Sequence, residues 1–312
     1  MEDLREERKQ RSMSTPIFVV GKHRSGTTLL SNLLLDHPEI AGVRHEAHEG
    51  IHESAYFSHV EDRYGDLSVA QNHVEFASVM SKSDYFTLAG VGFEDLLGLY
   101  PSTYAEVFRY VMNRVAEQEE ASFWVEKTPM HTELIFRIGK YYPDARFIGI
   151  RRNVVSTALS MLHLKNRQDA PPVKRLGYLL RVAADKYLLD HYMHMARREW
   201  PDRVLIVEFE ELVSEESTIL SHVCSFLSLD HVDLESRFPS NSSFGESKTV
   251  SIRGYEKWML RTVYKQILPL IPAALLRSLK RTRHRDPLPR WFFKFLRDTL
   301  GDSTLVTSRD RA

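Results

Sequence analysis

The stretch that decides the fold reads Pro16-Ile17-Phe18-Val19-Val20-Gly21-Lys22-His23-Arg24-Ser25-Gly26-Thr27-Thr28. An apolar, β-branched run ends at Gly21, a short polar loop follows, and residues 29–35 continue as an apolar helical segment. This order predicts a strand, an anion-binding loop and a helix, because the backbone N–H groups of such a loop and the positive end of the helix attract phosphate.

The spacing of Gly21 and Gly26 is that of a Walker A loop, but Thr27 stands where that loop has its lysine. Without this lysine the loop is poorly suited to the γ-phosphate of a nucleoside triphosphate. It suits a nucleotide with a shorter 5′ chain, and its positive charge lies inside the loop, at Lys22 and Arg24.

The composition of the 312-residue chain excludes several classes of protein. Its 42 basic and 42 acidic residues produce no net charge, so we expect no nucleic-acid partner. The only cysteine, Cys224, excludes an internal disulfide and fits a reducing compartment. No run approaches the roughly 18 apolar residues of a membrane span, and the polar residues 1–14 do not form a signal peptide. These features predict a soluble, cytoplasmic protein.

Strand and helix patterns alternate after the first helix. Strand patterns occupy residues 40–43, 123–126, 147–151 and 204–209, and helical patterns occupy 131–141, 153–164 and 174–200. This alternation predicts an α/β fold with a P-loop-like parallel sheet flanked by helices. Ligands of such sheets bind at the carboxyl ends of the strands. Residues 45–118 are mostly helical in pattern, and we expect them to form a helical acceptor-site insertion in a single domain.

We expect a flexible tail at residues 1–15, one domain at 16–262 and a C-terminal helical extension at 263–312. Basic residues at 277–290 precede an aromatic run at 291–296. The favoured interpretation is a terminal helix that packs its aromatic side chains on the domain, and contact with a membrane surface is the alternative.

A second informative segment follows the strand at 147–151. Arg152 stands at the end of this strand, a helix begins just after it, and Ser160 lies eight residues on, about two helical turns along. The rigid donor fork of an arginine together with a serine hydroxyl suits a phosphate monoester. The alternative is an arginine paired with a surface carboxylate and a solvated serine.

Taken in this order, the two segments resemble the sulfotransferase family, whose enzymes use 3′-phosphoadenosine 5′-phosphosulfate (PAPS). The resemblance implies that the loop holds the 5′-phosphosulfate, and that Arg152 and Ser160 hold the 3′-phosphate. The loop residues concerned are Lys22, Arg24, Ser25, Gly26, Thr27 and Thr28.

Residues 248–258 resemble the late loop with which this family closes over the nucleotide. The similarity lies in the spacing from Lys248 to Trp258 and in the pair Arg253-Gly254. The nucleotide-binding residues that it implies are Lys248, Ser251, Arg253, Gly254 and Lys257.

The chain is most similar to the branch that includes tyrosylprotein, heparan-type and many bacterial sulfotransferases. Residues 125–129 look like the Lys-Thr-Pro strand end of that branch, and His37-Pro38 follows the first helix as it does there. The chain departs from the branch at Phe209, where many relatives have a tyrosine. It also has no run that matches the membrane anchor of the Golgi members.

The resemblance also implies catalytic roles. Arg24, the loop amides and Lys127 would stabilise the negative charge that develops on the leaving phosphate. An acceptor hydroxyl or amine must lose a proton, and Glu46 is the best positional match for the family's base, with Glu49 as the fallback. The chemistry requires no metal. The alternative role for Lys127 is a structural ion pair with Glu126 or another acid.

Three other functions stay open at this stage. His48-Glu49-Gly50-Ile51-His52 fits the H-E-x-x-H pattern of zinc hydrolases, which requires both histidines on one helix. A P-loop small-molecule kinase would share the fold and the first loop, but Thr27 and the lack of a clear Mg²⁺-binding aspartate disfavour it. A nucleotide-binding protein without enzymatic activity is the third alternative.

Overall fold

The computed structural model describes residues 14–46, 50–165, 170–232 and 251–281. The chain divides into two compact units, and each is described here by itself. Unit 1 comprises residues 1–153 and 189–248, and unit 2 comprises residues 154–188 and 249–312. The boundaries expected from the sequence, with a domain at 16–262 and an extension at 263–312, stay a prediction.

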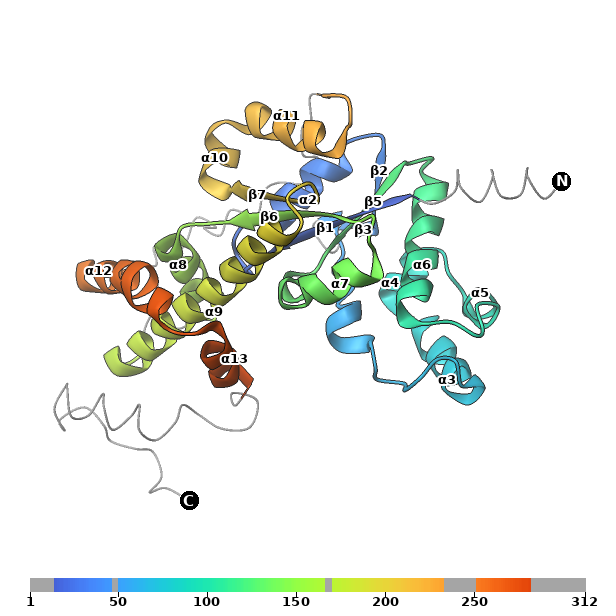
Figure 1. Cartoon of the computed structure of the whole chain (residues 1–312), viewed down its shortest axis with the longest axis horizontal. Coiled ribbons are helices and arrows are strands. Elements are labelled where there is room, and N and C mark those ends of the chain that lie inside the picture. The colour runs from blue at the N-terminus through green and yellow to red at the C-terminus, as the bar shows by residue number, and fades with distance from the viewer. Residues whose placement is uncertain (1–13, 47–49, 166–169, 233–250, 282–312) are drawn as a thin grey trace, which may run out of the picture. The chain divides into compact units, whose positions relative to one another are not determined.

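The centre of unit 1 is a sheet of five parallel strands in the order β2-β5-β1-β6-β7 (Figure 1). This confirms the predicted α/β fold with a parallel sheet. The strands are β1 (Thr15–Gly21), β2 (Ile40–Ala41), β5 (Phe123–Lys127), β6 (Arg146–Arg151) and β7 (Val204–Glu208).

The register of the sheet brings three functional segments to one edge. Val19 of β1 lies opposite Lys127 of β5, and Gly21 lies opposite Ile150 of β6. Because parallel strands end at the same edge of a sheet, the loop after Gly21, Lys127 and Arg152 meet there. The sheet therefore brings the predicted phosphosulfate loop, the predicted catalytic lysine and the arginine predicted for the 3′-phosphate to one edge.

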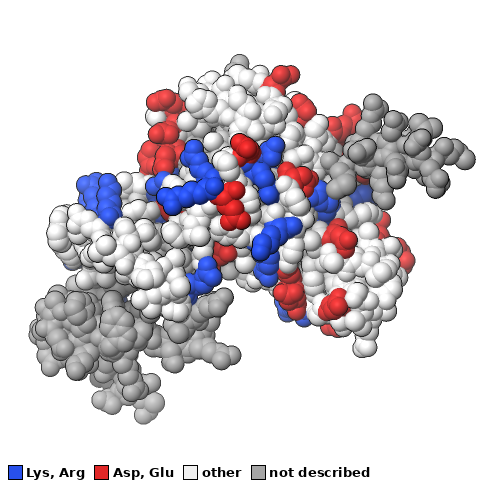
Figure 2. Space-filling view, viewed as in Figure 1, with Lys and Arg blue, Asp and Glu red and all other residues white. Residues whose placement is uncertain are grey.

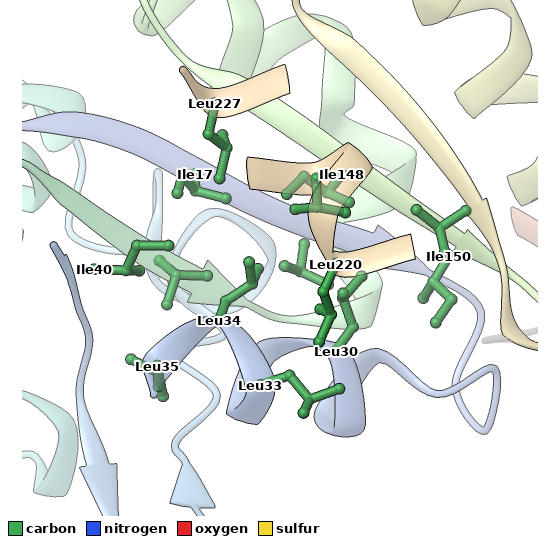
Figure 3. Close-up of a cluster of buried hydrophobic side chains, with 14 of the residues drawn as sticks. Ile17, Leu30, Leu33, Leu34, Leu35, Ile40, Ile148, Ile150, Leu220 and Leu227 are labelled. Atoms are coloured by element: carbon green, nitrogen blue, oxygen red, sulfur yellow. The ribbon is translucent and has the colours of Figure 1, made fainter. Parts of the chain in front are cut away.

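One face of the sheet is aliphatic. Ile17 and Val19 alternate along β1 and pack with Ile148 against α2 (Thr27–Leu35) and α11 (Glu216–Leu227). Figure 3 shows these contacts, with leucines of both helices directed at the strands. Burial of this side anchors α2 on β1, so the loop that joins them has fixed ends.

The opposite face is aromatic. The ring of Phe18 stacks on Phe147 at 5.5 Å and on Tyr142 at 5.7 Å, and meets Trp124 edge-on at 5.4 Å. All four side chains are almost fully buried. The helices on this side are α6 (Tyr104–Gln118) and α7 (Ile135–Tyr141), the latter preceded by a 3₁₀ turn, η3 (Pro129–Leu134). The predicted helix at 131–141 is therefore an α-helix only in its second half.

Residues after 55 are largely helical, as predicted for this region. The elements are the π-helical turn η2 (Tyr56–Val60), α3 (Ala70–Met80), α4 (Asp84–Leu88) and α5 (Phe93–Leu97), followed by α6. β7 is followed by α10 (Phe209–Ser214) and α11.

The region predicted to be mostly helical, residues 45–118, begins with a β-hairpin. Strand β3 (Arg44–His45) pairs antiparallel with β4 (Gly50–Ile51). The Asn32 side chain of α2 accepts a hydrogen bond from Ile51 N at 3.0 Å. Gly50 has φ 109°, and a Cβ there would lie 2.3 Å from the Asn32 amide oxygen. Contact with α2 therefore selects a strand at this position.

Unit 2 contains α8 (Val154–Leu164), α12 (Gly254–Thr262), the short turns η4 (Val263–Ile267) and η5 (Leu268–Leu270), and α13 (Ala273–Arg281). The long helix α9 (Pro172–Glu199) contributes its first part to unit 2 and its last part to unit 1. The aromatic run at 291–296 and its basic neighbours Arg283, Arg285 and Arg290 lie outside the described residues.

Among the described residues, no helix combines the length and apolarity needed to cross a membrane. On the face seen in Figure 2, Lys and Arg side chains are interspersed with Asp and Glu. The cytoplasmic location and the lack of a nucleic-acid partner stay predictions.

Candidate active site

The loop between β1 and α2 is held at its first residue by η3. Gly21 N donates to the Thr132 hydroxyl at 2.8 Å, and this hydroxyl lies 3.2 Å from Gly21 O. Within the loop, Ser25 N donates to Lys22 O at 3.0 Å. The loop is therefore a tight turn with a fixed start.

The end of the loop presents backbone N–H groups. Gly26, with φ 98°, is the N-cap of α2 and has no side chain to occupy the helix end. Arg24 also has positive φ, at 70°, which is uncommon for a residue with a Cβ. Because the first N–H groups of a helix have no acceptor inside it, Thr27 and Thr28 add donors to the positive end of the helix dipole. This end of α2 can bind an anionic oxygen.

Polar side chains of the loop are buried beside these donors. Ser25 is fully buried, and its hydroxyl has no hydrogen-bond partner among the described residues. Lys22 and Thr27 are also buried. An unsatisfied buried hydroxyl is costly, and a bound phosphate oxygen would satisfy it.

The conformation at Gly26 leads to a stability prediction. A Cβ at this position would lie 2.3 Å from the Phe209 ring and would also have to adopt the left-handed region. We expect Gly26→Ala to lower the free energy of unfolding by about 1–3 kcal/mol, measured by urea denaturation. The matched control is Gly177→Ala in α9, where a Cβ meets nothing within 4 Å. For this control we expect the free energy of unfolding to rise by about 0.5–1 kcal/mol. Equal effects of the two substitutions would contradict the prediction.

Lys127 extends from the end of β5 to the start of α2. Its buried Nζ lies 2.6 Å from Glu53 Oε1 and 3.3 Å from the Thr28 hydroxyl. The acid that contacts Lys127 is Glu53 and not Glu126, so the alternative of a structural ion pair with another acid stays open. The contact with Thr28 places an ammonium group at the N-terminal end of α2.

Glu53 is a candidate functional residue that the sequence pattern does not indicate. Its side chain is 40% exposed, so one carboxylate holds a buried lysine and also reaches solvent. Glu46, the predicted base, is exposed just after β3, and Glu49 lies outside the described residues. Glu53 is one of several acids in residues 46–53, and the sequence contains no signal of its contact with a lysine 74 positions away.

Glu126, the neighbour of Lys127, is the centre of a buried polar network. Its Oε1 accepts from the hydroxyls of Ser54 at 2.7 Å and Thr128 at 2.6 Å, and its Oε2 lies 2.8 Å from His131 Nδ1. Burial raises the pKa of Glu126, but the charge of His131 and these hydrogen bonds outweigh burial, so the pKa lies below its ordinary value. Glu126 is therefore an ionised acceptor that holds three donors.

Arg152 lies against the loop from the end of β6. Its Nη1 donates to Arg24 O at 3.1 Å, and its guanidinium lies 4.3 Å from the centre of the Phe209 ring. The pKa of Arg152 lies below its ordinary value, because burial and the nearby charge of Arg24 outweigh the opposite effect of Glu210. Arg152 Nε is buried without a hydrogen-bond partner among the described residues. Two close guanidinium groups and an unused donor suit an anionic ligand.

The remaining predicted nucleotide-binding residues belong to unit 2, apart from Lys248, which lies outside the described residues. Ser160 is buried on α8, and Ser251, Arg253, Gly254 and Lys257 are exposed at the start of α12. Arg253 N donates to Glu256 Oε2 at 2.8 Å. The structure thus brings four of these residues together around one helix start.

A buried ion pair holds this helix start in place. Arg175 Nε lies 2.7 Å from Glu256 Oε1, and Arg175 Nη2 donates to Ser251 O at 2.6 Å. Burial raises the pKa of Glu256, but the hydrogen bonds from Arg175 and from Arg253 N lower it more. The pair therefore links α9 to the segment 251–256.

Removing one partner of this pair has a large expected cost. We expect Arg175→Ala to lower the free energy of unfolding by about 3–5 kcal/mol, because Glu256 is left buried and uncompensated. Arg261→Ala, on the exposed side of α12, is the control and is expected to change it by less than about 0.5 kcal/mol. Thermal or urea unfolding measures both, and a loss below about 1 kcal/mol for Arg175→Ala would contradict the prediction.

The zinc-hydrolase alternative does not survive in the described residues. It requires a helix through residues 48–52, whereas Gly50 and Ile51 form strand β4. His52 Nε2 lies 3.1 Å from Asp84 Oδ2, and His48 and Glu49 lie outside the described residues.

The sequence of the chain matches that of a known protein family. A sequence model described as "Sulfotransferase family" matches residues 16–233, from β1 past α11. This chain belongs to the sulfotransferase family. The resemblance stated from the sequence is thereby confirmed, and membership supports a transferase that moves sulfuryl groups.

Solved sulfotransferase structures are similar to this sulfotransferase at low identity. The sulfotransferase domain from the Synechococcus PCC 7002 olefin synthase is 18% identical, with 88% of this chain and 96% of that chain covered and a TM-score of 0.48. The Alicyclobacillus acidocaldarius sulfotransferase is 16% identical, with 88% and 97% covered and a TM-score of 0.45. Mouse SULT7A1, solved with PAP, is 14% identical, with 82% and 67% covered and a TM-score of 0.38. No curated protein matches the chain.

Proposed function

We propose that this protein transfers a sulfuryl group from PAPS to a hydroxyl or amine acceptor by in-line displacement. The observation that carries the proposal is the convergence of three elements in unit 1. The N-terminus of α2, Lys127 from β5 and Arg152 after β6 surround the loop that begins at Gly21. This arrangement supplies donors and positive charge for the phosphate groups of PAPS.

The residues present fit such a donor. Ser25 Oγ and Arg152 Nε are buried donors whose hydrogen-bonding capacity the described residues leave unused. We assign the 5′-phosphosulfate to the loop residues Lys22, Arg24, Ser25, Gly26, Thr27 and Thr28. On the resemblance of their segments, we assign the 3′-phosphate and the nucleotide to Arg152, Ser160, Lys248, Ser251, Arg253, Gly254 and Lys257.

The chain stabilises charge where the leaving phosphate forms. PAPS supplies an activated sulfuryl group whose departure leaves negative charge on the 5′-phosphate. Lys127 Nζ and the amides at the start of α2 are donors fixed before the reaction, and we assign the same role to the Arg24 guanidinium. Such preorganised donors lower the barrier because they do not have to reorient as the charge develops.

An acceptor proton must leave as the new bond forms, and we assign its removal to Glu53 in place of Glu46. The Glu53 carboxylate is partly exposed and forms an ion pair with Lys127, whose Nζ also contacts the Thr28 hydroxyl. Through Lys127, Glu53 is thus an acid that lies close to the start of α2, where we place the phosphosulfate. Glu46 stays the competing candidate, and a comparison of the two variants separates them.

Arg152 gives the nucleotide-binding part of the proposal a direct test. We expect Arg152→Ala to weaken binding of adenosine 3′,5′-bisphosphate by about 2–4 kcal/mol, the scale of lost charge-assisted phosphate contacts, while 5′-AMP affinity changes little. Calorimetry measures both. Arg109→Ala, which removes an ion pair with Asp144, is the control. Equal losses for both nucleotides would contradict a role at the 3′-phosphate.

The transfer itself is tested with [³⁵S]PAPS and pooled hydroxyl and amine acceptors. We expect label in acceptor products, unchanged by EDTA, because Thr27 occupies the lysine position of a Mg²⁺-nucleotide loop and the chemistry needs no metal. Parallel reactions with [γ-³²P]ATP and Mg²⁺ test the kinase alternative. Transfer of phosphate without transfer of sulfate would overturn the proposal, and nucleotide binding without any transfer would favour the non-enzymatic alternative.

A further inference from the structure

Two consecutive residues of β5 hold two consecutive residues of the segment before η2. Lys127 contacts Glu53, and Glu126 accepts from the Ser54 hydroxyl. Neighbouring side chains of a strand point to opposite sides, so these two contacts hold the segment from both sides of β5. The Ala55 N–H adds a third link, because it donates to the Thr128 hydroxyl at 3.0 Å.

The buried end of this arrangement is rigid. Glu126 is 1% exposed and His131 is fully buried, and the two are joined at 2.8 Å. The Phe57 ring of η2 packs edge-on against His131 at 5.4 Å. Thr128 also donates to Glu126, so hydroxyls on both sides of the carboxylate share one oxygen.

We propose that Glu126 is a positioning residue that fixes Glu53 against Lys127 through the Ser54 hydroxyl. Glu53 lies in a segment without regular structure, and its side chain is 40% exposed. A flexible carboxylate loses much of its catalytic value, because a small misplacement of a reacting group slows the reaction strongly. The Ser54–Glu126 bond removes that freedom without contact between Glu126 and a substrate.

The inference rests on the proposed function for its kinetic consequence, whereas the position of Lys127 can be observed without any reaction. The main variant is Ser54→Ala, because Glu126→Gln changes a fully buried charge and can prevent folding. Ser54→Thr keeps the hydroxyl and is the rescue variant. Ser58→Ala removes a nearby hydroxyl in η2, one that donates to Ala55 O at 3.1 Å, and is the matched control.

The first readout is the ¹⁵N NMR signal of the Lys127 ammonium group, assigned by its loss in Lys127→Arg. We expect a signal protected from exchange in the wild type, Ser54→Thr and Ser58→Ala, and a signal broadened by exchange in Ser54→Ala. The second readout is steady-state turnover. We expect kcat of Ser54→Ala to fall about 10- to 100-fold, with the affinity for adenosine 3′,5′-bisphosphate within twofold of wild type.

An unchanged lysine signal in Ser54→Ala would overturn the inference. So would an equal loss of turnover, nucleotide affinity and thermal stability, since that result describes a structural role alone. If the wild type transfers no sulfate but the lysine signal still responds to Ser54→Ala, the proposed function fails and the positioning contact stands. The two failures are therefore distinguishable.

Discussion

Glu53→Gln is expected to lower kcat by about 10²- to 10⁴-fold, the range that a general base contributes. The glutamine keeps the shape of the side chain but cannot accept the acceptor's proton. Binding of adenosine 3′,5′-bisphosphate is expected to change little, because Glu53 reaches the phosphate site only through Lys127. Steady-state rates and calorimetry on the same preparations measure the two effects.

Glu46→Gln is the matched comparison for this prediction. Glu46 is exposed after β3, and we expect its replacement to lower kcat less than tenfold. Wild-type turnover in Glu53→Gln would remove Glu53 from the mechanism. A large loss only in Glu46→Gln would return the role to the residue that the positional resemblance indicated.

The second large effect is expected at Lys127. Lys127→Ala removes the ammonium group beside Thr28 and leaves Glu53 without its ion-pair partner. We expect kcat to fall about 10²- to 10³-fold, the loss found when one donor to developing charge is deleted. Single-turnover rates with saturating donor measure the chemical step directly.

Two further variants control for the charge and for general damage. Lys127→Arg keeps the charge with a different shape, and we expect a kcat between those of the wild type and Lys127→Ala. Lys140→Ala changes an exposed lysine of α7 and is expected to have no effect. If Lys127→Ala retains more than about one tenth of wild-type kcat, the lysine is structural.

The framework of this fold could be predicted because its signals are local. The apolar run that ends at Gly21, the loop and the leucine-rich segment after it define β1 and α2 within about 20 residues. Short apolar runs likewise predict the strands at 123–127, 146–151 and 204–208. Parallel strands have their carboxyl ends at the same edge of a sheet. The predicted strands therefore also predict that Lys127 and Arg152 lie near the loop between β1 and α2.

The hairpin β3–β4 could not be predicted from local pattern. The sequence from residue 44 to 53 is mostly polar and rich in histidine and glutamate, and it lacks the alternation of apolar and polar residues that is typical of a strand. Gly50 adopts φ 109° beside the Asn32 side chain, which also binds Ile51 from 19 residues away. A contact with α2 thus decides the structure, and the sequence pattern carries no record of it.

The same limit explains why Glu53 was missed. Its partner Lys127 is 74 residues away, and Glu126 holds Ser54 across 72 residues. The positional resemblance to the family indicates Glu46, an acid close to the second strand. Only the folded sheet shows which of these acids the lysine contacts.

The central claim is that the site accepts a 3′-phosphorylated adenine nucleotide, and isothermal titration calorimetry tests it most directly. The wild-type protein is titrated with adenosine 3′,5′-bisphosphate without metal, and with ATP in the presence of Mg²⁺. We predict clear binding of the bisphosphate and binding of ATP at least tenfold weaker. ATP binding as tight as or tighter than that of the bisphosphate would contradict the account.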